Sequence, residues 1–247
     1  MRLYAGAATR HRRYLVTTLT STPGPDVVRV WLASLDRPAL PLAWLASTLA
    51  PDESARAERF VFARDRERYQ VARGLLRATV GGATGCAPDA VRFDYTPNGR
   101  PLLAGRGELV FNLSHSGGHV AIAIAAGGGS PALALGVDIE QVRPIPEMDQ
   151  VARSVYASRE LAALASCADD EGRIATFHRL WTRKEACMKA TGAGLALDPL
   201  AFSVDAAATV QRVVLPPHPC APAGATVTVH HRPEPATEGC MGALAVG

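Results

Sequence analysis

The segment ALALGVDIE, at residues 132–140, decides the fold of the chain around it. It is predicted to be a strand, in which residues two apart face the same side of a sheet. Val137 and Ile139 then point into a core, while Asp138 and Glu140 point together to the other face. Two carboxylates about 6–7 Å apart on one face repel each other unless a cation lies between them. Such hard oxygen ligands suit Mg²⁺ or Mn²⁺, and the alternative is a strand end with two solvated acids.

Helical and extended segments are mixed on both sides of this strand. Further strands are predicted at 27–33, 108–113, 119–126, 200–204, 210–215, 225–231 and 241–246, and helices at 52–63, 65–80, 158–166 and 170–191. A glycine-rich break at 127–131 separates the two halves. We therefore expect an α/β (α+β) chain with a mobile basic tail at 1–22, an N-terminal α/β subdomain at 23–130 and a C-terminal α/β subdomain at 131–247. No sequence repeat relates the halves.

Composition and charge exclude several classes of protein. The chain has 247 residues, of which 48% are hydrophobic and 20% charged, as in an ordinary globular protein. Its longest apolar runs, such as 119–126, are much shorter than the roughly 18 residues that a membrane helix needs. The net charge is +3, but the first 22 residues carry +4 in arginines, which leaves −1 for the rest. The body of the chain therefore shows no charge signal for nucleic-acid binding.

The cysteines and the lysines are both informative. The five cysteines are odd in number and no pair has CxxC spacing, so free thiols in a reducing cytoplasm fit better than a disulfide framework or a zinc ribbon. Of the 26 basic residues, 24 are arginines, and the two lysines, Lys184 and Lys189, fall within one six-residue stretch. This clustering indicates a need for a compact ammonium group there, and chance is the alternative.

Three further segments carry polar groups in patterns that suit chemistry. Glu185 and Lys189 lie four residues apart on one face of a predicted helix, as a surface ion pair or as part of a site. The stretch FNLSHSGGH, at 111–119, can aim side-chain donors and backbone N–H groups at phosphate, or it is a polar hairpin loop. Seven arginines lie between residues 56 and 77, mostly on a solvated helical face, and one or two of them could hold a phosphate.

In chain order, arginine-rich helices are followed by NGRP at 98–101, FNLSH at 111–115, GVDIE at 136–140 and WTRKEACMKATGAGL at 181–195. This set resembles the Sfp-type 4'-phosphopantetheinyl transferase superfamily, over residues 60–202. The resemblance implies two similar α/β subdomains related by a pseudo-twofold axis, with a coenzyme A cleft between them. It also implies transfer of 4'-phosphopantetheine from coenzyme A to a serine of an apo carrier protein, which yields holo-carrier protein and 3',5'-ADP.

The resemblance assigns roles by position. Asp138, Glu140 and Glu185 correspond to Mg²⁺ ligands, with Mn²⁺ as a possible substitute. Lys189 corresponds to the lysine that reaches the reacting phosphate, and the base for the serine is Glu185 or a metal-bound hydroxide. A larger set corresponds to coenzyme A contacts: Arg56, Arg73, Thr96, Asn98, Gly99, Arg100, Asn112, Ser114 and His115. Of these, His115 corresponds to the contact with the 3'-phosphate.

The partner implied is an acyl or peptidyl carrier protein, most naturally one of polyketide or nonribosomal peptide synthesis. The chain is longer than the small trimeric members of the family, so a monomer is expected. Two other functions stay open. One is a Mg²⁺-dependent phosphohydrolase that acts on coenzyme A or nucleotides, and the other is a non-catalytic coenzyme A-binding module. The presence of all three carboxylates and both lysines disfavours the latter.

Overall fold

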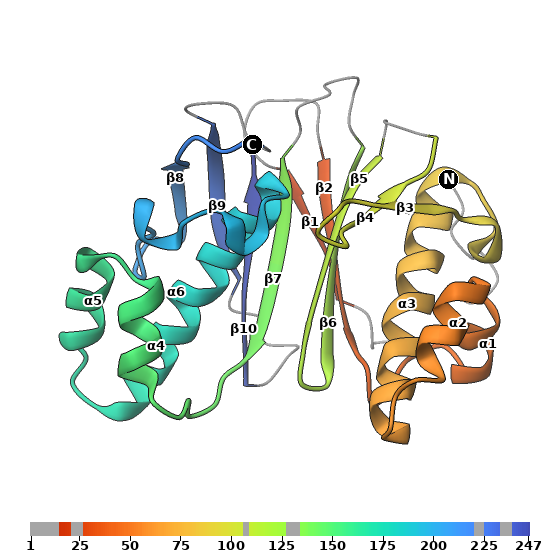
Figure 1. The fold of residues 1–247 in the computed structure, drawn as a ribbon, viewed down its shortest axis with the longest axis horizontal. Helices are drawn as coiled ribbons and strands as arrows, with labels where there is room; N and C mark the ends of the chain where they lie inside the picture. The colour runs from red at the N-terminus through yellow and green to blue at the C-terminus, as the bar shows by residue number, and fades with distance from the viewer. Residues whose placement is uncertain (1–14, 21–26, 106–108, 127–133, 220–224, 233–238) are drawn as a thin grey trace.

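The computed structural model describes residues 15–20, 27–105, 109–126, 134–219, 225–232 and 239–247. Two antiparallel four-stranded sheets lie side by side at the centre, and helices cover their outer sides (Figure 1). This mixed arrangement confirms the predicted α/β (α+β) fold class. No helix in the described ranges is long and apolar enough to cross a membrane.

The first sheet has the strand order β1-β2-β6-β5. Its strands are Leu15–Thr20 (β1), Val27–Ser34 (β2), Leu109–Ser116 (β5) and His119–Ala126 (β6), and its helices are Leu42–Ser47 (α1), Pro51–Ala57 (α2) and Ala63–Thr84 (α3). Strand β6 is buried on both faces. Ile122 and Ile124 pack with Leu45 and Leu76 of the helices, whereas Ala121 contributes to the core shared with the second sheet. These residues pack on different sides of the sheet because successive side chains of a strand point to opposite faces.

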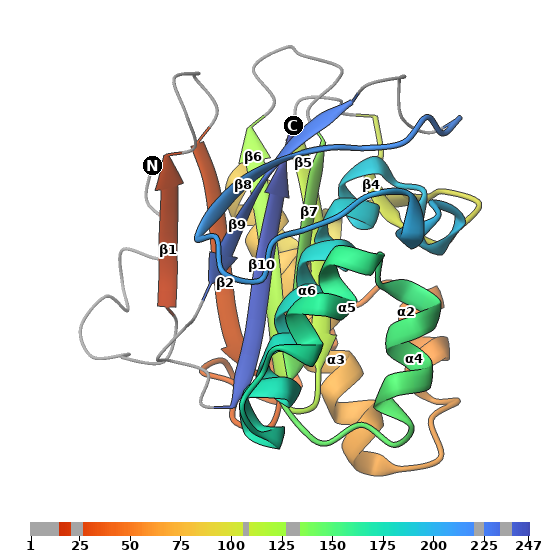
Figure 2. The same ribbon diagram turned by 90° about the vertical axis from the view of Figure 1, so that its left-hand side faces the viewer.

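The second sheet has the order β7-β10-β9-β8. Its strands are Leu135–Gln141 (β7), Val210–Val214 (β8), Thr226–Arg232 (β9) and Cys240–Val246 (β10), and its helices are Met148–Val155 (α4), Ser158–Ala165 (α5) and Asp170–Thr191 (α6). Helix α6 packs directly on β7, β9 and β10, with α4 and α5 beside it (Figure 2). Gly136 of β7 permits this close approach, since a Cβ there would overlap the carbonyl oxygen of Ala186.

The arginine-rich helices differ from the prediction in length. Helices were expected at 52–63 and 65–80, but α2 is shorter and α3 longer. Helix α3 continues through Gly81 and ends at Gly85, where φ is +73°. A Cβ at Gly81 would lie 2.7 Å from the carbonyl oxygen of Cys86. This glycine therefore allows close packing inside a helix, whereas Gly85 supplies the left-handed residue that ends it.

The strand predicted at 200–204 is wrong. The chain there forms a short 3₁₀ turn, Pro199–Ala201 (η3), without a strand after it. The side chain of Asp198 accepts a hydrogen bond from the backbone N–H of Leu200 at 2.9 Å, so a capping interaction outweighs the apolar pattern. Helices α1 and α4 were not predicted.

The expected tail at 1–22 also needs a correction. Its residues Leu15–Thr20 form β1, which pairs antiparallel with β2 and extends the first sheet. Residues 1–14 and the glycine-rich break at 127–131 lie outside the described residues. The boundary between the subdomains 23–130 and 131–247, and the pseudo-twofold axis, therefore stay predictions.

A buried carboxylate joins helices α2 and α3. Glu53 is 2% exposed, and its Oε1 accepts from Arg73 Nε at 2.8 Å while its Oε2 accepts from Arg77 Nε at 2.5 Å. The backbone N–H of Ala50 also donates to Oε2 at 2.9 Å. Burial raises the pKa of Glu53, but the two arginines and the Ala50 amide outweigh it and hold the pKa below its ordinary value. These contacts of Glu53 hold α2 against α3, the two helices that carry Arg56 and Arg73.

Replacement of this carboxylate should destabilise the fold. In Glu53→Ala the buried guanidinium groups lose their counterion, so we expect the free energy of unfolding to fall by about 3–5 kcal/mol, measured by urea denaturation. The exposed neighbour Asp52 offers a matched control, and Asp52→Ala should stay within about 0.5 kcal/mol of wild type. Because the folded pKa of Glu53 is depressed, its contribution exists above the ordinary glutamate pKa and is lost as pH falls through the depressed value. Equal acid sensitivity of Glu53→Ala and wild type would contradict this role.

Candidate active site

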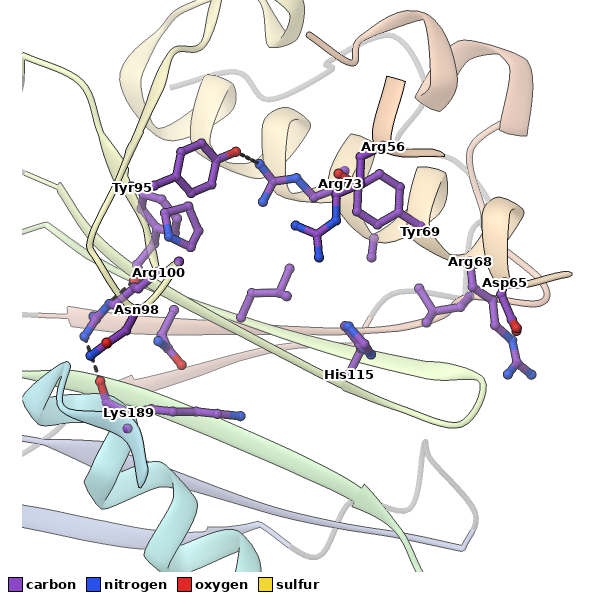
Figure 3. Close-up of a pocket in the computed structure, with 18 of the residues that line it drawn as sticks. Arg56, Asp65, Arg68, Tyr69, Arg73, Tyr95, Asn98, Arg100, His115 and Lys189 are labelled. Atoms are coloured by element: carbon purple, nitrogen blue, oxygen red, sulfur yellow. Dashed lines mark hydrogen bonds between the residues drawn. The ribbon is translucent and has the colours of Figure 1, made fainter. Parts of the chain in front are cut away.

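A cavity of about 930 Å³ opens between the two halves of the chain (Figure 3). Helices α2 and α3, strand β5, the end of α6 and the turn between β3 (Phe93–Tyr95) and β4 (Pro101–Leu103) line it. Its basic lining residues are Arg56, Arg59, Arg68, Arg73, Arg100 and Lys189, and its acidic ones are Asp52 and Asp65. A concave site with this excess of positive charge suits an anionic ligand of moderate size.

The cavity brings together most of the residues expected to bind coenzyme A. Seven of the nine line it, namely Arg56, Arg73, Asn98, Gly99, Arg100, Asn112 and His115. Thr96 and Ser114 do not. Thr96 Oγ1 accepts from the backbone N–H of Arg100 at 3.1 Å, which holds the turn. Ser114 instead contacts the charged residues described below.

Asp138 lies beneath the cavity as a buried acid on β7. It is 2% exposed, and its Oδ1 accepts from Lys189 Nζ at 2.6 Å and from Ser114 Oγ at 2.8 Å. Its Oδ2 is buried and has no hydrogen-bond partner within the described residues. Burial raises the pKa of Asp138 to about 7; Lys189 opposes the shift and the charge of Glu140 adds to it. The acid is thus under-satisfied, which a further cation would relieve.

Two more acids lie near Asp138. Glu140 follows on the same face of β7, and its Oε2 accepts from Ser116 Oγ at 2.5 Å. Burial raises the pKa of the half-buried Glu185 on α6; Lys189 opposes this, and the charge of Glu140 raises it further. A divalent cation would relieve both this mutual repulsion and the unpartnered Oδ2, and carboxylate oxygens are the ligands that it prefers. Among the described residues, however, no three such side chains converge closely enough to hold a metal, and the Lys189 ammonium occupies the position beside Asp138.

The two lysines have different environments. Lys184 is 1% exposed, and its Nζ contacts Glu160 Oε2 at 2.9 Å and the carbonyl oxygens of Pro199 and Phe202 at 2.6 and 2.7 Å. These three acceptors match the three N–H bonds of one ammonium group. Lys184 therefore belongs to the core, whereas Lys189, five residues later, turns toward the cavity (Figure 3).

Four of the five arginines that line the cavity fall into two groups. Arg73 is held by Glu53 and by the hydroxyl of Tyr95 at 2.7 Å, and Arg68 is held by both carboxylate oxygens of Asp36 at 2.7 and 2.8 Å. The second group consists of Arg56 and Arg59, whose side chains have no hydrogen bond or ion pair within the described residues. The Arg56 guanidinium carbon lies 5.5 Å from the centroid of the Tyr69 ring. These two cations are the ones available to an anion. The sequence placed Arg59 only within a set of seven arginines, of which one or two could hold a phosphate. Its place on the loop after α2, at the cavity, distinguishes it from the others.

Two residues that were predicted to contact the ligand instead form hydrogen bonds between the two halves of the protein. Asn112 is buried on β5, and its Oδ1 accepts from the backbone N–H of Val137 on β7 at 2.9 Å. Arg100 donates to the carbonyl oxygen of Lys189 at 2.7 Å. His115, by contrast, opens onto the cavity (Figure 3). Desolvation by the surrounding protein, followed by the charge of Lys189, lowers its pKa.

Comparison with known proteins agrees with this site. Residues 134–223 match the family described as the 4'-phosphopantetheinyl transferase superfamily, and residues 39–127 match the family described as 4'-phosphopantetheinyl transferase, N-terminal. The chain is 40% identical over 174 residues to 4'-phosphopantetheinyl transferase HetI of Nostoc sp., covering 69% of this chain and 71% of HetI. The chain belongs to the 4'-phosphopantetheinyl transferase superfamily, and it is an enzyme of that class.

Two further relatives are less similar to this chain than HetI. The L-aminoadipate-semialdehyde dehydrogenase-phosphopantetheinyl transferase of Rattus norvegicus is 29% identical over 180 residues, which are 68% of this chain and 55% of the rat protein. The 4'-phosphopantetheinyl transferase Sfp of Bacillus subtilis is 29% identical over 158 residues, which are 64% of this chain and 66% of Sfp. Enzymes of this superfamily use coenzyme A and act on carrier proteins.

The contrast between the lysines yields a paired prediction. Lys189→Arg keeps the charge, but a planar guanidinium does not fit beside Asp138 and Ser114, so we expect kcat to fall at least about tenfold with the thermal midpoint close to wild type. Lys184→Arg should show the reverse, a clear fall in midpoint with a smaller effect on kcat, since its acceptors are buried backbone and Glu160. A fully active Lys189→Arg enzyme would reduce Lys189 to an ion-pair partner.

Proposed function

We propose that this enzyme transfers 4'-phosphopantetheine from coenzyme A to a serine hydroxyl of an apo carrier protein. The serine oxygen attacks the β-phosphate, the bond from that phosphorus to the bridging oxygen breaks, and 3',5'-ADP leaves with the bridging oxygen. The serine proton passes to a base, for which Glu185 is the candidate because burial raises its pKa. The products are holo-carrier protein and 3',5'-ADP.

The observation that carries this proposal is the cationic cavity beside the buried contact between Asp138 and Lys189, with Glu140 and Glu185 nearby. Phosphoryl transfer depends on positioning and on stabilisation of negative charge, which this arrangement can supply. The Lys189 ammonium, 2.6 Å from Asp138, lies at the cavity wall where it can contact a phosphate oxygen. Arg56 and His115 can bind the 3'-phosphate farther along the same cavity.

The chemistry also calls for Mg²⁺, which Asp138, Glu140 and Glu185 would hold. When bound, it would neutralise charge on the pyrophosphate. If Lys189 left Asp138 Oδ1, that oxygen would keep only the hydrogen bond from Ser114 Oγ, and Oδ2 would stay without a partner among the described residues. The ammonium could then turn to the substrate phosphate. Mn²⁺ offers the same preference for hard oxygen ligands.

We assign the carrier partner to an acyl or peptidyl carrier protein of polyketide or nonribosomal peptide synthesis, with a monomeric enzyme acting in the cytoplasm. The similarity to HetI and Sfp supports a carrier-protein substrate. Cys86, Cys167, Cys187 and Cys240 are free thiols, as a reducing compartment favours.

The transfer itself can be measured by intact mass. The enzyme, coenzyme A, Mg²⁺ and an apo carrier protein should give a carrier that is heavier by about 340 Da, the mass of one phosphopantetheine on a serine phosphodiester. A carrier with its serine replaced by alanine is the control and should gain nothing. Phosphate release without a carrier would favour the phosphohydrolase, and binding of coenzyme A without any reaction would favour the non-catalytic module.

Removal of divalent metal should abolish transfer. We expect no turnover in excess EDTA, with recovery on addition of Mg²⁺ or Mn²⁺, and a loss of about 3 kcal/mol or more of transition-state stabilisation in Asp138→Ala. Thermal unfolding of the wild type in EDTA is the control for general damage. Full activity in EDTA would exclude the metal role of the three acids.

A further inference from the structure

Arg100 joins the two halves of the protein through backbone carbonyl groups. Its Nη1 donates to the carbonyl oxygen of Lys189 at 2.7 Å, and its Nη2 donates to that of Leu135 at 3.1 Å and, more weakly, to that of Phe111 at 3.5 Å. These acceptors lie on the last turn of α6, at the start of β7 and on β5. Within the described residues no carboxylate pairs with Arg100, and burial lowers its pKa. The planar fork of a guanidinium can reach several acceptors in this way.

The hairpin between β3 and β4 aims this side chain. The backbone N–H of Gly99 donates to the carbonyl oxygen of Thr96 at 2.8 Å, and Gly99 has a φ of +76°. The backbone N–H of Thr96 donates to the carbonyl oxygen of Arg100 at 2.9 Å, which closes a three-residue loop. Such a loop, a turn followed by a left-handed glycine, fixes the register of the hairpin. The sequence TPNGR thereby sets the position of Arg100 before any ligand binds.

The acceptor on α6 is the carbonyl oxygen of Lys189, the residue whose ammonium group contacts Asp138. The last carbonyl groups of a helix lack partners within the helix and carry its partial negative charge. The carbonyl oxygen of Lys189 is one of these, and it accepts from the backbone N–H of Gly192 at 3.1 Å as well as from Arg100. Asn98 Nδ2 makes a second, longer contact with the carbonyl oxygen of Gly192 at 3.5 Å. Figure 3 shows Arg100 and Asn98 of the hairpin beside Lys189 at the end of α6.

We propose that Arg100 is a positioning residue that holds the last turn of α6 so that the Lys189 ammonium lies at the cavity wall beside Asp138. This inference rests on the proposed transfer reaction. It replaces the expectation that the Arg100 side chain binds the nucleotide. Arg100 acts through Lys189, so its loss should impair turnover far more than affinity for coenzyme A.

The test compares Arg100→Met, which keeps the length but removes the donors, with Arg100→Lys, which keeps the charge but removes the fork. We expect kcat to fall at least about tenfold in both, because small displacements of a reacting group are costly, while KM for coenzyme A changes less than about threefold. Arg92→Met is the matched control. Arg92 is exposed and also donates to backbone carbonyl groups, those of Asp89 and Val91 at 2.8 and 3.2 Å, but within its own half. Its replacement should leave kcat near wild type.

A double-mutant cycle separates positioning from general stability. In a Lys189→Ala background, Arg100→Met should change the residual kcat less than about twofold, since the group it positions is gone. An equal loss of kcat in both backgrounds would overturn the proposal in favour of a purely structural role. A large rise in KM for coenzyme A with unchanged kcat would overturn it in favour of a nucleotide contact.

Amide hydrogen exchange provides a readout that does not depend on activity. Arg100→Met should speed exchange in the last turn of α6, at residues 188–192, without a matching change in α3. Unchanged protection from exchange at residues 188–192 would refute the role of Arg100 in holding the last turn of α6. This holds even if the wild-type enzyme proved to lack transferase activity. If wild type fails to modify a carrier but exchange rises as expected, the contact stands and the proposed reaction fails.

Discussion

The close approach of helix α6 to strand β7 is the constraint on which the site depends. A Cβ at Gly136 would overlap the carbonyl oxygen of Ala186, so helix and strand can meet at this depth because the strand has a glycine there. Two residues farther along β7, Asp138 is buried under the same helix, 2.6 Å from the ammonium of Lys189. The glycine of GVDIE and the helix WTRKEACMKATG thus form one packing unit. The chemistry follows from that packing, since it forces acidic and basic groups into a shared, poorly solvated space.

Three carboxylates are buried in the described part of the chain, and only one of them has an oxygen without a hydrogen-bond partner. Glu53 is satisfied by two arginines and the Ala50 amide, and Glu160 is satisfied by Lys184 and the amides of Ala157 and Val204. Asp138 differs, because its Oδ2 has no partner. The first two pairs hold helices together, as fully paired buried ions can do. The unsatisfied third is the one that adjoins the cavity, as expected where function outweighs stability.

The two halves of the protein depend on each other at the site. The first half supplies the cationic wall of the cavity and the hairpin that carries Arg100, while the second half supplies the three acids and Lys189. Asn112 and Arg100 cross between the halves with their side chains and end on backbone groups of β7 and α6. Polar contacts of this kind fix relative position, because each buried backbone group must find a partner. The cavity therefore has its shape before substrate enters.

The sequence by itself determined the fold class, the enzyme class and the strand that carries Asp138, because alternation and short motifs are local properties. It also placed Glu185 and Lys189 on one helix. Tertiary structure decided what no local pattern encodes: that Gly81 packs inside a helix instead of ending it, that Lys184 faces the core, and that Arg100 reaches the carbonyl of Lys189 from 89 residues away. For Lys184 and Arg100 the deciding contacts come from residues distant in sequence, and for Gly81 from the chain that folds back after the helix, and in each case these contacts outweigh the local preference of the residue.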